Sequence, residues 1–184
     1  MKRYYYPLFF IFFMGKSLTA QVELKVNIFG FYYDVPYISA EYFVNEKFGL
    51  EVGTGFNSKK VNEIDSERKS MFFVTAKHYL FDNKGDSYDR IFLGLYLSSQ
   101  VYYRISSSAF RTTYKIPSFI IGGMIGRKWM YTKNIFMEAN LGIGLSNNKI
   151  TYEPNESVFF INEVERKTKA GVFLSFVVGY RFDN

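Results

Sequence analysis

The 184-residue chain has the length of a single domain, and its composition already excludes several kinds of protein. It contains no cysteine, so disulfides, thiolate nucleophiles and cysteine-ligated metal sites are excluded. Aromatic residues make up 21% of the sequence, which exceeds the need of one small soluble core; Tyr and Trp favour the boundary between membrane and water. The formal net charge of +6 is modest and its basic residues are dispersed, which argues against a nucleic-acid-binding protein.

The N-terminus predicts a secretory signal peptide over residues 1–20. Two basic residues open it, an apolar run occupies residues 8–14, and the small residue Ala20 precedes the expected cleavage site. The run is shorter than the ~20 apolar residues of a membrane-spanning helix, so a cleaved signal is favoured over an N-terminal anchor. The mature domain is expected at residues 21–184, with a net charge of +3 because three basic residues leave with the signal. Those residues are Lys2, Arg3 and Lys16.

Eight segments alternate between apolar and polar or small side chains, with the two-residue period of β-strands. In chain order they cover residues 21–33, 37–44, 48–56, 71–80, 91–103, 117–127, 135–145 and 169–182. The sixth segment is apolar on both faces, so its register is the least well defined. An even number of strands closes a barrel with both ends on the same side of a membrane. The sequence therefore predicts an all-β fold, an eight-stranded antiparallel up-and-down transmembrane β-barrel that follows the cleaved signal peptide.

The connections between these segments are unequal in length. Long polar loops are expected on the outward side at residues 57–70, 104–115 and 146–168, and short inward turns at residues 45–47 and 133–134. The last outward loop contains an apolar run, Val158 to Ile161. We interpret this run as part of a packed hairpin that extends the last two strands; the alternative is a sheet edge that captures a partner by strand addition.

The final segment shows the alternation most fully. One face carries only apolar and aromatic side chains, from Ala170, Val172, Leu174, Phe176, Val178, Tyr180 and Phe182. The opposite face carries Gly171, Ser175, Gly179 and Arg181, together with Phe173 and Val177. Eight strands enclose a space just wide enough for side chains to fill. The face rich in glycine is therefore expected inside, and the large apolar face is expected against lipid.

The signal peptide, the eight alternating segments and the aromatic-ended last strand together resemble the small outer-membrane β-barrel family of Gram-negative bacteria. The segment from Ile38 to Gly53 looks like the repeated hairpin of that family, and the ending Gly179-Tyr180-Arg181-Phe182 is similar to its terminal strand. The resemblance implies a location in the outer membrane and recognition of the last strand by the barrel-assembly machinery. This chain departs from the pattern by adding Asp183 and Asn184 after the terminal aromatic residue.

Charged residues on the inward face are the first candidate for function. They are Glu41, Glu51 and Glu138, with Lys25, Lys77 and Arg181. Charges in a narrow lumen must be paired or hydrogen-bonded, because their desolvation is costly. We favour a structural ion-pair network that fills the lumen over a gate or proton-linked pore, because eight strands leave little room for a channel.

His78 is the only histidine and the one candidate for a catalytic base. Barrel enzymes that remove acyl chains from lipid A pair a histidine with a nearby serine on the membrane-facing wall, and the sequence around His78 offers no serine at that spacing. We therefore expect His78 to be an interfacial side chain, and a single histidine without cysteine does not indicate a metal site.

These observations predict a non-enzymatic outer-membrane barrel that contributes to envelope integrity or to surface interaction through its outward loops. A lipid A-modifying barrel enzyme and a secreted soluble barrel that binds a small apolar ligand are the alternatives. We expect no catalytic, cofactor-binding or metal-ligating residues. The expected partners are outer-membrane lipid and the barrel-assembly machinery, with a monomeric barrel, no nucleic acid, and an extracellular partner that the sequence does not identify.

Overall fold

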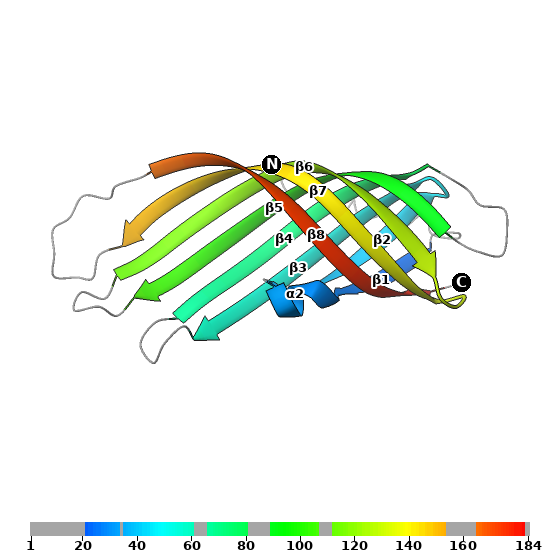
Figure 1. Ribbon diagram of the computed structural model, residues 1–184, viewed down its shortest axis with the longest axis horizontal. Coiled ribbons are helices and arrows are strands. Elements are labelled where there is room, and N and C mark those ends of the chain that lie inside the picture. The colour runs from blue at the N-terminus through cyan, green and yellow to red at the C-terminus, as the bar shows by residue number, and fades with distance from the viewer. Residues whose placement is uncertain are drawn as a thin grey trace, which may run out of the picture.

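A computed structural model describes residues 21–33, 35–60, 66–80, 89–106, 112–153 and 165–182 of the chain. It contains β1 (Val22–Asn27), α2 (Ile28–Tyr33), β2 (Tyr37–Asn45), β3 (Phe48–Lys60), β4 (Ser66–Tyr79), β5 (Asp89–Ser106), β6 (Thr112–Met130), β7 (Ile135–Glu153) and β8 (Glu165–Phe182). Each strand pairs antiparallel with its neighbours in sequence, and β1 pairs with β8 to close the barrel (Figure 1). The predicted fold class and strand number are confirmed.

The strands reach farther on the outward side than the sequence pattern predicted. The loop expected at residues 57–70 is largely a continuation of β3 and β4, whose pairing extends to Lys60 opposite Ser66. The loops expected at residues 104–115 and 146–168 are likewise shortened by longer strands. Polar residues can continue a strand because each added pair extends the backbone hydrogen-bond ladder, and an opposite charge pair such as Lys59 facing Glu67 adds to it. The run from Val158 to Ile161 lies outside the described residues.

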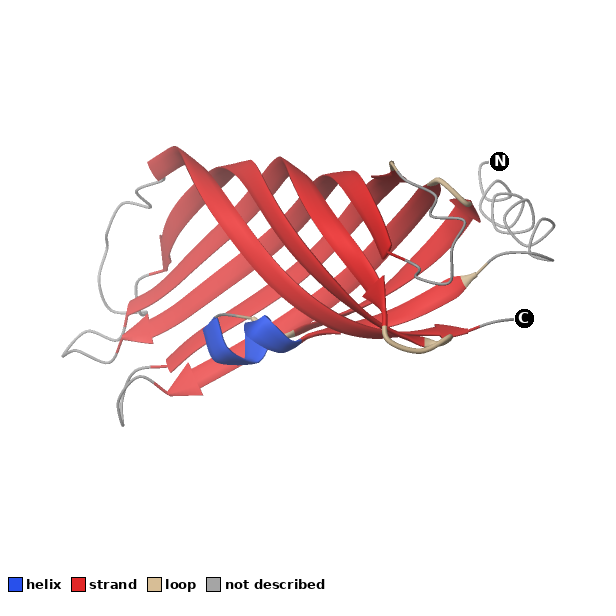
Figure 2. Cartoon of the chain, turned by 45° about the vertical axis from the view of Figure 1, so that its right-hand side comes forward, coloured by secondary structure: helices blue, strands red, loops and turns tan. Residues whose placement is uncertain are grey.

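The extended hairpins project together at one end of the barrel. The end of β8 lies at the other end, beside the turn between β6 and β7 (Figures 1 and 2). The two short turns are present where predicted, although the second is longer and covers residues 131–134. Asn45 accepts hydrogen bonds from the backbone N–H groups of Lys47 and Phe48, each at 2.9 Å. Thr132 accepts one from Ile135, also at 2.9 Å.

The first predicted strand is wrong in its second half. β1 ends at Asn27, and residues 28–33 form the short helix α2, which follows β1 directly and contacts β8 (Figure 1). The Asn27 side chain faces inward and accepts a hydrogen bond from the Gly30 N–H at 3.2 Å, as an N-cap residue does. A side chain at Gly30 would overlap the backbone of Val35 and Pro36. The cap and the close return of the chain together favour a helix over the strand that aromatic residues would otherwise form.

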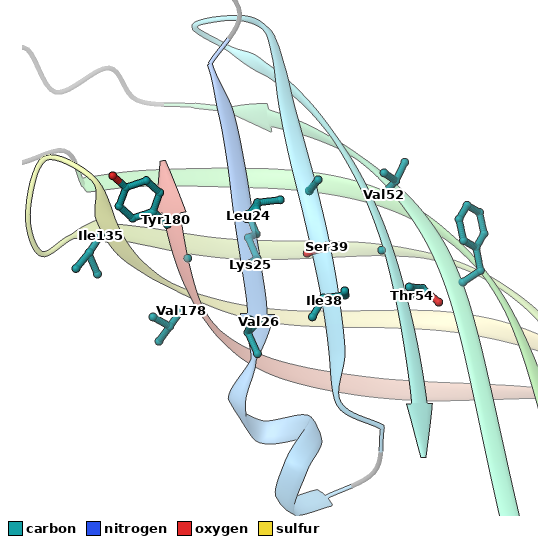
Figure 3. Close-up of a pocket in the computed structure, with 14 residues that line it drawn as sticks. Leu24, Lys25, Val26, Ile38, Ser39, Val52, Thr54, Ile135, Val178 and Tyr180 are labelled. Atoms are coloured by element: carbon teal, nitrogen blue, oxygen red, sulfur yellow. The ribbon is translucent and has the colours of Figure 1, made fainter. Parts of the chain in front are cut away.

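The two faces of the barrel are those predicted. The outward side chains are large and apolar, and a shallow groove of about 730 Å³ crosses β8, β1, β2 and β3 on this surface. In Figure 3, Leu24, Val26, Ile38 and Val52 project outward from these strands. The side chain of Lys25, between Leu24 and Val26, is buried in the lumen. Within the described residues, no helix is long and apolar enough to cross a membrane.

Glycine on the inward face makes room for aromatic rings in the lumen. A Cβ atom at Gly142 would overlap the ring of Phe173, and one at Gly179 would overlap the ring of Phe136. Phe136 is completely buried. The positions of individual rings thus confirm the volume argument that placed the glycine-rich face inside.

Candidate functional site

A layer of eight charged side chains, which we call the charged layer, crosses the lumen. Every strand except β5 contributes at least one member, and the alternation of each strand turns the side chain inward. The members are Glu23, Lys25, Glu41, Glu51, Lys77, Lys128, Glu138 and Arg181, each at most 4% exposed. Four carboxylates balance four cations, so the layer is formally neutral.

The register of the first three strands places three carboxylates in one row. Glu23 lies opposite Glu41, and Glu41 lies opposite Glu51. Like charges directly opposite each other on paired strands destabilise a sheet. Cations reaching into the row offset this repulsion, and Lys25 contacts Glu41 and lies 3.2 Å from Glu51.

Glu138, on the opposite wall, is held by amines from both sides of the lumen. Its carboxylate oxygens lie 2.8 Å from Lys25 Nζ and 2.5 Å from Lys77 Nζ. Lys77 also lies 2.6 Å from Glu51. Each amine thus bridges carboxylates on different strands, and the layer ties β1, β3, β4 and β7 together across the barrel.

The remaining two cations, Lys128 and Arg181, both donate hydrogen bonds to Glu23. Lys128 donates to one Glu23 oxygen at 2.6 Å and to the Tyr79 hydroxyl at 2.7 Å. Arg181 donates to the other Glu23 oxygen from Nε at 3.0 Å and from an amino group at 2.8 Å. Hydrogen bonds that join ionised donors and acceptors are about twice as strong as neutral ones.

All six charged residues predicted for the lumen lie there, and two further members of the charged layer, Glu23 and Lys128, were missed. Arg181 pairs with Glu23, because closure of the barrel places these two residues opposite each other on β8 and β1. Glu23 was detectable, since it alternates with Lys25 on the polar face of β1. Lys128 was missed because it lies one residue beyond the predicted end of the sixth strand, whereas β6 continues to Met130.

Aromatic rings pack against the charged layer on the side of the short turns. Phe43, Tyr79 and Phe92 form a buried cluster there, with ring centroids of neighbouring pairs 5.4–5.5 Å apart. Lys128 Nζ lies 4.9 Å from the centroids of Phe43 and Tyr79, and Lys77 Nζ lies 4.5 Å from that of Phe92. Cations over ring faces are stabilised by the ring quadrupole. Charges and rings together fill this part of the lumen.

Comparison with known proteins assigns the sequence to a family. The family model described as "Protein of unknown function (DUF3575)" matches residues 6–178. The chain belongs to the DUF3575 family. A comparison with curated proteins gives no match.

The fold of this DUF3575 protein is similar to solved outer-membrane barrels. It is similar to a major outer membrane protein from Thermus thermophilus (TM-score 0.57, 8% identity), covering 89% of this chain and 99% of that one. It is also similar to OprG from Pseudomonas aeruginosa (TM-score 0.54, 12% identity, 90% and 97% covered). The N-terminal barrel domain of OprF from the same organism gives a TM-score of 0.50 at 19% identity, with 89% and 97% covered. The DUF3575 protein thus has the outer-membrane barrel fold that the resemblance implied.

His78 of the DUF3575 protein lies on the outer face of β4, between Phe48 and Leu93 on the paired strands. Its ring centroid is 4.5 Å from that of Phe48. The two residues directly opposite His78 on the paired strands are therefore apolar, and neither is a serine or a carboxylate. Among the residues that the structure describes, no group of three or more His, Cys, Asp or Glu side chains is arranged to hold a metal ion.

Proposed function

We propose that this protein is a non-enzymatic, non-conducting outer-membrane barrel that contributes to envelope integrity or surface interaction through its outward hairpins. The observation that carries the proposal is the charged layer, in which the fully buried Lys25 contacts Glu41 and Glu138 and Lys77 reaches Glu138 from β4. An open pore would require these charges to separate, which would break several short ion pairs. An unpaired charge in a dry interior has a high free-energy cost.

The outer surface supports the same proposal. Leucine, isoleucine, valine and phenylalanine side chains cover the wall, with Leu95 72% exposed and Val172 72% exposed. A soluble monomer rarely shows water a continuous apolar surface of this kind, whereas lipid accommodates it. Closure of the barrel leaves no unpaired strand edge in hydrocarbon along the β1–β8 seam. The barrel is therefore proposed to be monomeric, with outer-membrane lipid as its surrounding partner.

The end of β8 fits recognition by the barrel-assembly machinery. Tyr180 and Phe182 are each 46% exposed on the outer face, and their rings pack edge-to-face with centroids 4.9 Å apart. Both are available to a partner before the barrel inserts. We propose that the machinery binds this aromatic pair.

Cell fractionation and single-channel recording test the proposed function together. The protein should sediment with outer membranes, migrate faster on SDS gels when it is not boiled, and give no stepwise conductance in planar bilayers. A protease added to intact cells should cut between residues 154 and 164, in the connection between β7 and β8. Recovery in the soluble periplasm would refute the membrane location, and large conductance steps would refute the sealed lumen.

A further inference from the structure

Two basic side chains lie in one row on the outer face of the barrel, near its outward end. Arg68 on β4 pairs in register with Tyr103 on β5, and Tyr103 pairs with Lys115 on β6. Alternation turns all three away from the lumen, because each lies an even number of residues from an exposed apolar residue of its own strand. We call Arg68, Tyr103 and Lys115 the basic row.

The two cations of the basic row can reach the same bound group. Neighbouring strands are spaced by about 4.8 Å, so the backbones of Arg68 and Lys115 lie roughly 10 Å apart. Lys115 Nζ lies 5.6 Å from the centroid of the Tyr103 ring, so this side chain leans from β6 toward β5 and shortens the gap. Arg68 is exposed and reaches from the other side. A phosphate over Tyr103 would accept charge-assisted hydrogen bonds from both cations.

No described carboxylate neutralises the basic row. Of the side chains that the structure describes at this level, the only carboxylate is Glu67, which alternation turns toward the lumen, 3.9 Å from Arg104. The inner end of the wall differs. There Arg127 lies 5.3 Å from the centroid of Trp129, but it also donates to Asp89 at 2.9 Å. The outward row therefore carries positive charge that the described side chains leave unbalanced.

The height of the basic row coincides with the edge of the hydrocarbon. On the outer face of β5 an apolar run extends from Ile91 to Val101 and is interrupted only by Ser99. The run covers roughly 34 Å of strand, or about 25 Å along the membrane normal at the usual tilt of roughly 35–45°. The apolar band of an outer-membrane barrel is about 25 Å tall. Tyr103 is the next outer-face residue, so the basic row lies at the level of the lipid headgroups.

The wall below the basic row offers apolar contacts to an acyl chain. Ser99 lies between Phe72 and Phe119 on the paired strands, and these two rings are 55% and 53% exposed. A lipid whose headgroup is held at the basic row would place its acyl chains along these rings. Headgroup and chain would thus meet the surface chemistry that suits each of them.

We propose that the basic row is a binding site for the phosphate group of an anionic lipid in the outer leaflet. Arg68 and Lys115 hold the phosphate above Tyr103, and Phe72 and Phe119 contact the acyl chains. Charge complementarity and the position at the edge of the hydrocarbon favour a lipid phosphate over a soluble anion. The proposal rests on the proposed membrane location, because it names one lipid among those that surround the wall.

Native mass spectrometry of the full mature barrel, released from zwitterionic detergent micelles, tests the site with diphosphoryl lipid A as the probe. The barrel should retain this lipid saturably at mole fractions at which it does not retain phosphatidylcholine. Arg68→Gln and Lys115→Gln should each weaken retention about fivefold, because a basic residue near an anionic surface contributes roughly that factor. An excess of inorganic phosphate should not displace the lipid.

Cations on the lumen side of the same rim supply the matched control. Lys59 and Lys169 are exposed, and alternation places both on the side opposite the lipid-facing wall. The double variant Lys59→Gln with Lys169→Gln removes as much charge as Arg68→Gln with Lys115→Gln, but it should leave retention unchanged. A label on the otherwise unmodified barrel gives a second readout. Bimane on Ser70→Cys, one row below Arg68 on the outer face, should change its emission when the lipid binds; bimane on Met137→Cys, near the inner end, should not.

Three results would overturn the proposal. Equal losses in the two double variants would show attraction to the whole rim rather than to the basic row. Displacement by inorganic phosphate would assign the row to a soluble anion. Equal retention of phosphatidylcholine would show that the wall holds acyl chains without reading negative charge. Failure of the proposed membrane location is detected separately, because fractionation of cells reports it before any lipid is added.

Discussion

At the scale of single residues, the lumen shows how burial changes the value of an interaction. An ion pair such as Asp89 with Arg127 is on the surface, with the Arg127 side chain 52% exposed. Water competes for both partners of such a pair, so it contributes at most about 1 kcal/mol. Glu138 is completely buried and holds three amines. Removing its charge leaves those amines short of a partner in a dry interior.

Glu138→Gln is therefore predicted to lower the free energy of unfolding by about 3–5 kcal/mol, because the isosteric amide opens no cavity but leaves one buried positive charge of the layer uncompensated. Urea titration of the micelle-bound barrel, followed by tryptophan fluorescence, measures the change. Asp89→Asn is the control and should shift stability by less than about 1 kcal/mol. Equal effects of the two substitutions would mean that the charged layer is hydrated rather than dry.

The inward glycines make a second residue-scale prediction. Gly142→Ala should destabilise the barrel by about 1–3 kcal/mol, because the added methyl group overpacks against Phe173. Gly171 is the matched control, since a Cβ atom there meets no heavy atom within 4 Å. Gly171→Ala should leave stability unchanged or raise it by up to about 1 kcal/mol, because alanine restricts the unfolded chain. Salt should not alter the Gly142 effect; a salt-dependent effect would contradict a steric cause.

At the scale of the strand, the alternation of side chains decides whether each residue faces the lipid or the lumen. Along β7, Leu141 is 51% exposed on the outer face, and its neighbours Asn140 and Gly142 are buried in the lumen. Along β3, Val52 is 43% exposed between the buried Glu51 and Gly53. Of two neighbouring residues on one strand, one thus faces lipid and the other faces the polar lumen.

Leu141→Arg and Val52→Arg are each predicted to lower stability by ~2–4 kcal/mol, the cost of an arginine near the bilayer midplane. Ser58→Arg on the exposed outward end of β3 is the control and should cost at most about 1 kcal/mol. Unfolding in lipid vesicles, rather than in detergent, is the appropriate measurement. A penalty at Ser58 as large as that at Val52 would place the bilayer differently along the strands.

At the scale of the whole molecule, closure turns eight amphipathic strands into a wall with two unlike sides. The β1–β8 seam has six residue pairs, from Val22 with Phe182 to Asn27 with Val177. It brings the first and last strands together and places Glu23 beside Arg181. The wall faces lipid, and the lumen holds the aromatic cluster and the charged layer. In the proposed function, this arrangement seals the barrel.

Cysteine labelling should report the two sides of the wall directly, because the native chain has no cysteine. Single cysteines at Val52, Leu141 and Leu174 should react with a lipid-soluble maleimide in membranes. Cysteines at Ser39 and Ser175, which are buried in the lumen, should not react. The opposite pattern would mean that the faces are inverted and would favour a soluble ligand-binding barrel.

The sequence alone determined the fold class, the number of strands and the two faces of the wall. These follow from local patterns. The two-residue period places side chains alternately on opposite faces, and the face with small glycines, rather than large leucines, fits inside the narrow lumen. Six of the eight charged residues in the lumen followed from the same pattern. The signal peptide over residues 1–20 stays a prediction.

Only the tertiary structure decided which charges meet. The pairing of Arg181 with Glu23 joins the last strand to the first, and the contact of Lys77 with Glu138 spans the lumen from β4 to β7. Register and closure set such contacts, and no pattern within one segment encodes them. The helix α2 and the outward strand lengths were likewise decided by backbone pairing and close approach, as at Asn27 and Gly30. Alternation assigns a residue to a side of the wall, and the closed barrel assigns its partner.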